Sequence, residues 1–301
     1  MSDISSLFDL HIQAYLQGPL LLAALAAFGL VVGVLTGLFG VGGAFIVTPL
    51  LNVGFGIPYE LAIGSSLSFT VGTSSSAVGL HVRLGHFEPR STFILAAASI
   101  LGAWLGATCN TRLSDALGKH HYTLLMHALF VVMLVVTAWL VGRGRPEGPR
   151  GASLLQRLPI GPYIDLPQAG LKRISATGMV LVGLGIGAVG GMMGIGGGVL
   201  FMPLLILVVG LTAHQAVGTS LGVVAFSSVA GTVHFALEGH VNLCIVMALL
   251  VSSVIGVQIG AWACHRLHAA RLQRYFAVLV ALVAVCVAVE LVRSLMTGVS
   301  H

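Results

Sequence analysis

Two stretches of the chain, residues 18–59 and 174–213, contain no Asp, Glu, Lys or Arg. A membrane-spanning helix needs about 20 mainly apolar residues, so each stretch is long enough for two helical segments. Charged residues make up only 8% of the whole chain, against about 25% in an ordinary soluble domain. We therefore predict an all-α integral membrane protein. The further apolar segments are 61–80, 91–111, 122–142, 215–233, 241–263 and 275–292.

A run of glycines interrupts each charge-free stretch, at residues 37–43 and 190–198. When the sequence is shifted by 154 positions the two runs coincide, and Pro49 falls on Pro203. A match at a fixed offset indicates an internal repeat. We predict two repeats of about five apolar segments each, with glycine-broken helices at corresponding places. An odd number of crossings in each repeat inverts one repeat relative to the other.

The basic residues predict how the segments are oriented in the membrane. Residues 143–173 are rich in Pro, Gly and Arg, and they connect a first repeat at 19–142 to a second at 174–296. If this connector is cytoplasmic, most of the 14 Lys and Arg residues lie on the cytoplasmic side, as the positive-inside rule requires. We expect a multi-pass protein of the cell (inner) membrane with both termini outside. Residues 1–18 are expected to lie on the membrane surface.

Two pairs of motifs resemble one family of transporters. Residues 37–51 (GLFGVGGAFIVTPLL) and 191–205 (GMMGIGGGVLFMPLL) are similar to the paired signature of the sulfite exporter TauE/SafE family of membrane transporters. Residues 62–67 and 216–221 are similar to the segment that follows the signature, while Ala44 stands where a third glycine is usual. The resemblance implies a secondary transporter that exports a small anion, sulfite or an organosulfonate, by alternating access at a site between the repeats.

The glycine runs also predict how an anion is bound. In lipid, irregular backbone is tolerated only where it is buried in protein or lines a cavity. Glycine lets a ligand approach the main chain, and a helix that begins after the break directs free N–H groups at it. Ser and Thr hydroxyls add uncharged donors. The predicted substrate-binding residues are Gly40, Gly42, Gly43, Gly194, Gly196, Gly197, Gly198, Ser65, Ser66, Thr219 and Ser220.

Both residue types have an alternative role. Glycines also allow helices to pack closely, and this is the role expected for four of them. Hydroxyls also bond to the backbone of their own helix or of a neighbouring helix. The glycines assigned to helix packing are Gly102, Gly106, Gly256 and Gly260.

Titratable groups are rare inside the apolar segments. The one carboxylate within a segment is Glu290, which is expected to pair with Arg293, so the sequence disfavours a pathway for cations. Histidine changes charge near neutral pH, and four histidines flank corresponding helix ends. These candidates for gating or proton linkage, whose alternative is a plain interfacial position, are His81, His86, His234 and His240.

The sequence indicates no other chemistry. It has no catalytic motif and no metal-ligand spacing, so we expect no catalytic residue, no metal and no cofactor. The expected partners are a small anionic substrate and the lipid bilayer, without nucleic acid. An anion channel and an intramembrane enzyme are the alternatives to a transporter. The identity of the anion, the coupling ion and the oligomeric state stay open.

Overall fold

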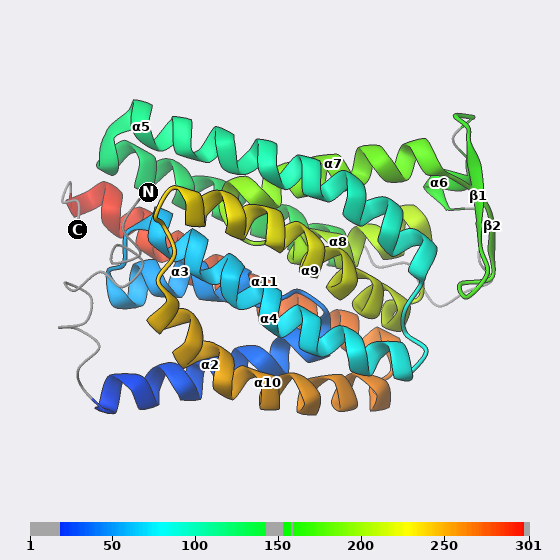
Figure 1. The fold of residues 1–301 in the computed structure, drawn as a ribbon, viewed down its shortest axis with the longest axis horizontal. Coiled ribbons are helices and arrows are strands. Elements are labelled where there is room, and N and C mark those ends of the chain that lie inside the picture. The colour runs from blue at the N-terminus through cyan, green and yellow to red at the C-terminus, as the bar shows by residue number, and fades with distance from the viewer. Residues whose placement is uncertain (1–18, 143–152, 158, 298–301) are drawn as a thin grey trace.

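The computed structural model describes residues 19–142, 153–157 and 159–297. In this part of the chain the elements are helices, apart from one β-hairpin (Figure 1). The segment expected on the membrane surface, residues 1–18, lies outside the described residues. The elements are α2 (Pro19–Phe39), α3 (Ala44–Phe55), α4 (Tyr59–Arg83), α5 (Pro89–Gly142), α6 (Leu154–Arg157), β1 (Tyr163–Leu166), β2 (Leu171–Ser175), α7 (Ala176–Met193), α8 (Gly198–Leu204), the π-helix η2 (Leu205–Val209), α9 (Ala213–Leu237), α10 (Leu243–Arg266) and α11 (Ala269–Thr297).

The helices lie roughly side by side in a bundle with three layers. In Figure 1, α5 and α7 run along the top, α2 and α10 along the bottom, and α3, α4, α8, α9 and α11 lie between them. The α2 helix begins and α11 ends at the left end of the bundle, whereas the hairpin of β1 and β2 lies at the right end. The described part of the connector is therefore at the opposite end from the first and last helices.

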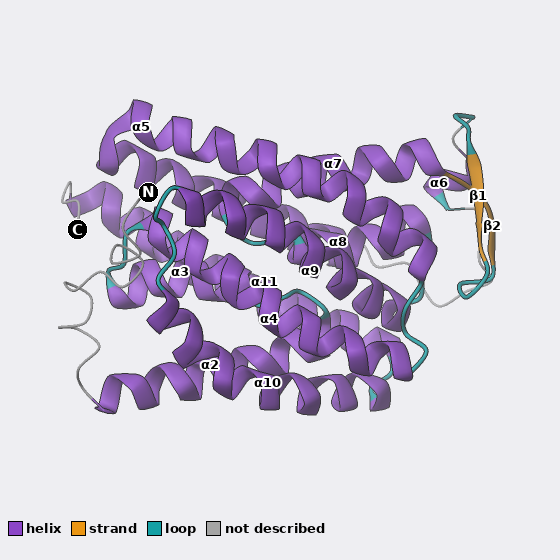
Figure 2. Cartoon of the chain, in the orientation of Figure 1, coloured by secondary structure: helices purple, strands orange, loops and turns teal. Residues whose placement is uncertain are grey.

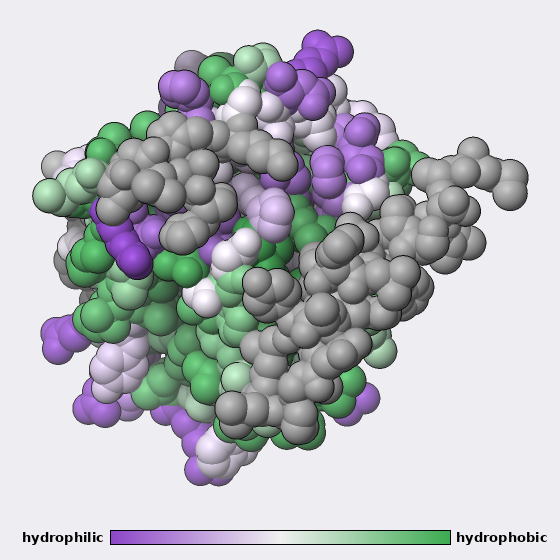
Figure 3. Space-filling view, turned by 90° about the vertical axis from the view of Figure 1, so that its left-hand side faces the viewer, coloured by the Kyte–Doolittle hydropathy of each residue, from purple (hydrophilic) through white to green (hydrophobic). Residues whose placement is uncertain are grey.

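The outside of the bundle is apolar, as the predicted membrane protein requires. Six of the described helical segments are long and apolar enough to cross a bilayer, and the shorter apolar helices accompany them. Large hydrophobic side chains point outward along these helices, among them Leu101, Leu105, Trp139 and Val251. Figure 3 looks at the end where α2 begins, and it shows separate groups of hydrophilic residues on a largely hydrophobic surface. The outward hydrophobic side chains along the sides of the helices form a surface that is stable against lipid rather than water.

The two helix breaks are shorter than the glycine runs that predict them. The α2 helix continues through Gly37 to Phe39, and α7 continues through Gly190 and Gly191 to Met193. The breaks proper are residues 40–43 and 194–197. Six glycines there have positive φ, which side chains with a Cβ rarely adopt, so the helix ends where these glycines begin. These are Gly40 (73°), Gly42 (76°), Gly43 (90°), Gly194 (71°), Gly196 (62°) and Gly197 (79°).

A short helix follows each break. The first, α3, contains Pro49, and the second contains Pro203 and passes from α-helix into π-helix at Leu205. Proline supplies no backbone N–H and its ring crowds the carbonyl of the preceding turn, so the helix at that point lacks a normal hydrogen bond. Both short helices stop at a glycine with positive φ, Gly56 and Gly210.

One expected boundary differs from the structure. The segments 91–111 and 122–142 belong to one helical stretch, α5, which is interrupted only by the non-helical backbone of Gly118 (φ 69°, ψ 155°). The two segments turn back on each other there, as Figure 2 shows at the left of the bundle. The strand β2 ends at Ser175, whose hydroxyl caps α7 by accepting from the Gly178 N–H.

The expected packing glycines are confirmed. A Cβ on Gly256 would collide with the Leu30 carbonyl of α2, and a Cβ on Gly102 would collide with the Leu184 carbonyl of α7. The same holds for Gly260 and Gly106, against the Val34 and Ala188 carbonyls. The helices of the pairs α2–α10 and α5–α7 are thus in direct backbone contact, which only glycine permits.

This close packing predicts the effect of a single methyl group on α7. A Cβ on Gly187 would lie 2.5 Å from the Ser99 carbonyl oxygen, whereas nothing lies within 4 Å of a Cβ on Gly185. We expect Gly187→Ala to lower the free energy of unfolding by about 1–3 kcal/mol, as overpacking does. The control Gly185→Ala should be neutral or slightly stabilising, because Ala is the better helix former. Melting of the detergent-solubilised protein measures both, and equal melting temperatures would contradict the packing argument.

Candidate functional site

The two glycine breaks meet in the interior of the bundle. A Cβ on Gly198, at the start of α8, would collide with the Val41 carbonyl of the first break. Residues 40–43 and 195–198 are buried. Their partners lie well inside α4 and α9, and Figure 2 shows the two loops part-way along the bundle rather than at its ends. The structure therefore brings together the seven glycines that the sequence assigns to substrate binding.

A hydroxyl on the opposite half of the chain binds the first carbonyl of each break. The Ser220 hydroxyl of α9 donates to the Gly40 carbonyl at 2.7 Å. The hydroxyls of Ser66 in α4 and Thr48 in α3 each lie 3.1 Å from the Gly194 carbonyl and 2.6 Å from each other, so one donates to the carbonyl while the other donates to its neighbour. Ser66 and Ser220 are 154 positions apart, and so are Gly40 and Gly194. The two contacts are therefore equivalent, and both predicted serines touch the loops.

A second pair of hydroxyls binds the next exposed carbonyls. Thr73 of α4 donates to the Gly42 carbonyl at 3.0 Å, and Ser227 of α9 donates to the Gly196 carbonyl at 2.9 Å. Thr70 donates to the Gly42 carbonyl as well, at 3.0 Å. These hydroxyls satisfy loop carbonyls that would otherwise be unpaired in an apolar interior, where an unpaired polar group is costly.

Donors without a partner remain beside the loops. Within the described residues, the Ser74 and Ser228 hydroxyls are fully buried and have no hydrogen-bond partner. The Ser74 oxygen lies 3.1 Å from where a Cβ on Gly42 would stand, and Ser228 takes the same place beside Gly196. In the same part of the chain, the backbone N–H groups of the residues that open α3 and α8 have no acceptor. These residues are Gly43, Ala44, Gly197 and Gly198.

Side chains fill the space next to the loops. A Cβ on Gly42 would lie 2.7 Å from the methyl groups of both Thr70 and Val224, and a Cβ on Gly196 would lie 3.3 Å from the same Val224 methyl. Val224 of α9 is fully buried and therefore sits between the second glycines of the two breaks. A solute could approach these glycines only if Val224 moved away.

Two of the predicted binding residues form hydrogen bonds with the turns that precede helices, and not with the carbonyls of the breaks. The Ser65 hydroxyl accepts a hydrogen bond from the Asn242 N–H at 2.9 Å, just before α10. The Thr219 hydroxyl accepts from the Glu88 N–H at 3.1 Å, just before α5. Ser65 and Thr219 are themselves 154 positions apart, so these contacts are again equivalent. Their hydroxyls stabilise turns, which is the alternative role that the sequence leaves open.

The four candidate histidines separate into two groups. His81 and His86 face each other with their Nδ1 atoms 3.2 Å apart, at the end of α4. His234 packs edge-on against Trp104, with ring centroids 5.2 Å apart, and its Nε2 atom has no partner within the described residues. His240 follows the turn after α9, and its carbonyl lies against Gly64. The structure does not bring any of the four to the glycine loops.

Sequence reasoning left several residues around the loops out of the expected binding site. Ser74 and Ser228 are among the hydroxyls that crowd α4 and α9 and could donate to an anion, but they were not selected, although they are serines at the repeat offset and lie two turns beyond Ser66 and Ser220. Val224 carried no usable signal, because a valine in an apolar helix is indistinguishable from a core residue. Glu290 is confirmed beside Arg293, with a 3.9 Å contact between carboxylate and guanidinium.

These features define a class of protein: an all-helical, multi-pass membrane protein with two broken helices in its interior. The family profile described as "Sulfite exporter TauE/SafE" matches residues 25–287. The chain therefore belongs to the TauE/SafE family of membrane transporters.

Relatives in other organisms agree with this assignment. A "probable membrane transporter protein" of Xylella fastidiosa is 30% identical over 263 residues, which cover 86% of this chain and 92% of the relative. The "probable membrane transporter protein YjnA" of Bacillus subtilis is 30% identical over 77% of this chain and 86% of the relative. A further Bacillus subtilis protein, YdhB, is 26% identical over 76% of this chain and 84% of the relative. No solved structure matches the chain.

The hydroxyl contacts of the loops predict unequal effects of two serine substitutions. Among the described residues, Ser220 is the one donor to the Gly40 carbonyl, whereas Thr48 still reaches the Gly194 carbonyl when Ser66 is removed. Ser220→Ala should therefore cost about 1–3 kcal/mol of stability, the penalty of an orphaned buried acceptor, and Ser66→Ala should cost less. The measurement is the melting temperature of the solubilised variants.

The control for both serines is Ser68→Ala. The Ser68 hydroxyl donates only to the Gly64 carbonyl of its own helix, so its loss should change little. If Ser68→Ala and Ser220→Ala lowered the melting temperature equally, the contact between Ser220 and the first break would have no special importance.

Proposed function

We propose that this protein is a secondary transporter that exports a small anion, with sulfite or an organosulfonate as the cargo. The family assignment and the names of the relatives support transport rather than catalysis. The proposed binding site lies where the two glycine breaks meet, between the two halves of the chain.

One observation carries this proposal: uncharged hydrogen-bond donors without partners converge on the two breaks. The N–H groups that open α3 and α8 and the hydroxyls of Ser74 and Ser228 are unpaired in the described part of the chain. The start of a helix also carries a partial positive charge. Backbone N–H groups of this kind bind oxyanions without a cationic side chain, and they leave no fixed charge buried in lipid when the anion departs.

The equivalent contacts support the proposal that the two halves are inverted repeats. Hydroxyl contacts with the breaks, glycine contacts between helices and turns before α5 and α10 all recur at an offset of 154 positions. We further propose that residues 19–142 and 174–296 are the two repeats and that the connector is cytoplasmic. Both termini then lie outside, and the chain resides in the cell (inner) membrane.

The way in which the breaks are held supports alternating access as the mechanism. Each break is bonded to both halves, because Ser220 of α9 holds Gly40 and Ser66 of α4 holds Gly194. A relative movement of α4 and α9 would displace Val224 and change the position of both breaks together. When an anion with one negative charge leaves a cell with a negative interior, the membrane potential supplies about 2.3 kcal/mol of free energy per 100 mV. Export therefore needs no coupled cation.

The test is flux of ³⁵S-labelled sulfite and small organosulfonates in proteoliposomes with an imposed potential. We expect electrogenic flux with the wild type and a loss of about tenfold or more with Ser74→Ala combined with Ser228→Ala, the equivalent of about 1.4 kcal/mol. The matched control is Ser68→Ala, because the Ser68 hydroxyl donates to a carbonyl of its own helix.

The substitutions Gly42→Val and Gly196→Val test whether the anion binds beside the breaks. Both glycines have positive φ and no room for a Cβ, so transport should be lost. A protein that reconstitutes well but carries no small anion above protein-free liposomes would refute the proposed function. A flux that saturates as the substrate concentration rises indicates a transporter. The current through an anion channel would not saturate over the same concentrations.

A further inference from the structure

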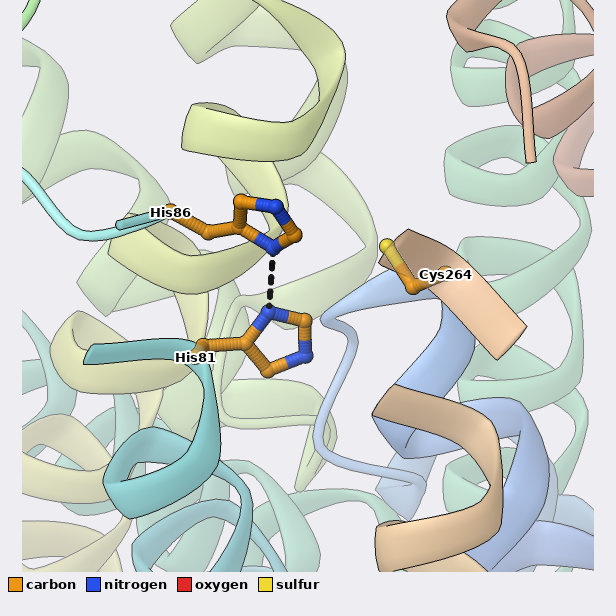
Figure 4. Close-up of side chains that lie close together, drawn as sticks. All are labelled: His81, His86 and Cys264. Atoms are coloured by element: carbon orange, nitrogen blue, oxygen red, sulfur yellow. Dashed lines mark hydrogen bonds between the residues drawn. The ribbon is translucent and has the colours of Figure 1, made fainter. Parts of the chain in front are cut away.

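A cluster of histidines and one cysteine lies at the end of the bundle where α4 and α10 finish. His81 is in the last turn of α4, His86 follows in the turn before α5, and Cys264 is in the last turn of α10. One ligand atom from each of these three residues lies within 4.8 Å of the other two. Figure 4 shows the two imidazole rings tilted against each other, with a nitrogen of each directed at the other and Cys264 on a neighbouring helix beside them.

The spacing of the two imidazoles suits a tetrahedral metal ion. Two nitrogens bound to Zn²⁺ at 2.0–2.1 Å in a tetrahedron are about 3.3 Å apart. The Nδ1 atoms of His81 and His86 are 3.2 Å apart. A thiolate sulfur in the same tetrahedron lies about 3.6 Å from each nitrogen, and the ligand atoms lie within 4.8 Å of one another, so the Cys264 sulfur needs to approach by about 1.2 Å at most. A side chain as short as cysteine makes such a shift by turning about its χ1 bond.

The hydrogen bonds around the two rings set which nitrogens could bind a metal. Nε2 of His81 lies 2.9 Å from the Gly37 carbonyl, and a carbonyl can only accept, so Nε2 carries the proton and Nδ1 keeps its lone pair. The 3.2 Å contact between the two Nδ1 atoms is therefore a hydrogen bond that His86 donates. A metal ion would replace that proton, and Nε2 of His86, which lies 3.3 Å from Nδ1 of His265, would then carry the proton and donate it there. Metal-binding histidines are typically held in this manner, with the remote N–H donated to a carbonyl or another acceptor.

The cluster is buried on most sides but lies next to an exposed histidine. His81 and Cys264 are fully buried, whereas His265 beside them is exposed and marks a route from water. His214, whose Nε2 lies 3.1 Å from the Cys264 carbonyl, covers the remaining side with its ring centroid 5.1 Å from that of His86.

The fold itself does not demand these three residues. At the positions related by the offset of 154, the second half has Phe235 in place of His81 and the first half has Asn110 in place of Cys264. Phe235 lies in the last turn of α9, and Asn110 lies within α5, where it bonds to the Met192 carbonyl at 2.6 Å. Only His86 has a histidine counterpart, His240. A ligand set is therefore present in one half alone.

We propose that His81, His86 and Cys264 form a binding site for Zn²⁺ or a similar thiophilic divalent ion, with His214 or water as the fourth ligand. The bound ion would join the ends of α4 and α10. Through the bond between His81 and Gly37, it would also fix the helix that leads into the first glycine break. The site is separate from the proposed anion site.

The experiment uses the full-length protein, purified in detergent with a non-histidine tag and stripped of metals by a chelator. Zinc affinity is measured by isothermal titration calorimetry, and Co²⁺ serves as a spectroscopic probe. We expect one tight zinc site per chain and, with Co²⁺, the visible absorption of a tetrahedral ion together with a thiolate-to-cobalt charge-transfer band. Cys264→Ser should abolish that band and weaken zinc binding by more than about 100-fold.

Two matched controls separate the site from general binding by cysteine and histidine. Cys244→Ser removes the other cysteine of α10, and His240→Ala removes the counterpart of His86; both should leave the zinc affinity and the cobalt spectrum unchanged. A wild-type cobalt spectrum without a thiolate band would overturn the proposal, and so would equal zinc affinity in the wild type and Cys264→Ser. Because the wild-type spectrum reports sulfur ligation directly, the test does not depend on the folding of a variant or on transport.

Discussion

Everything in this fold depends on hydrogen bonds that satisfy exposed backbone in an apolar interior. A helix break within a membrane leaves carbonyl and N–H groups that lipid cannot bind. Here hydroxyls from α4 and α9 bind the carbonyls of both breaks, with Ser66 and Ser220 each reaching across to the opposite half. The carbonyls are thereby stabilised while several N–H groups stay unpaired. This imbalance is the basis of the proposed anion site.

Much of the architecture could be predicted from the sequence because the membrane imposes simple rules. The length of the stretches without charged residues predicts the helices, and the runs of closely spaced glycines predict approximately where the helices break. The residues 37–39 and 190–193 nevertheless stay helical, because a glycine whose φ is negative and whose face packs against another helix does not end a helix. Gly37, for example, lies against the Val257 carbonyl of α10. Density alone does not distinguish a packing glycine from a breaking one.

The contacts of individual side chains were harder to foresee. Ser65 and Ser66 are adjacent and both recur at the repeat, yet they point to different neighbours: one accepts from the turn before α10 and the other donates to a break. Successive helix residues lie about 100° apart, so the direction of each depends on which helices surround it. In the histidine and cysteine cluster, Cys264 lies 183 positions after His81 and 178 positions after His86, and no spacing rule within one helix predicts such a cluster.

The glycine contacts between helices have a mechanical consequence. In the pairs α2–α10 and α5–α7, backbone touches backbone and no flexible side chain separates the two helices. If one helix slid along the other, its carbonyl oxygens would collide with Cα atoms of the partner helix. Each pair is therefore expected to move as one rigid unit. Between the two pairs, α4 and α9 contact each other through side chains, for example that of Leu67 against Gly231, and such contacts can rearrange. A rotation of one pair relative to the other would therefore take place at the contact between α4 and α9.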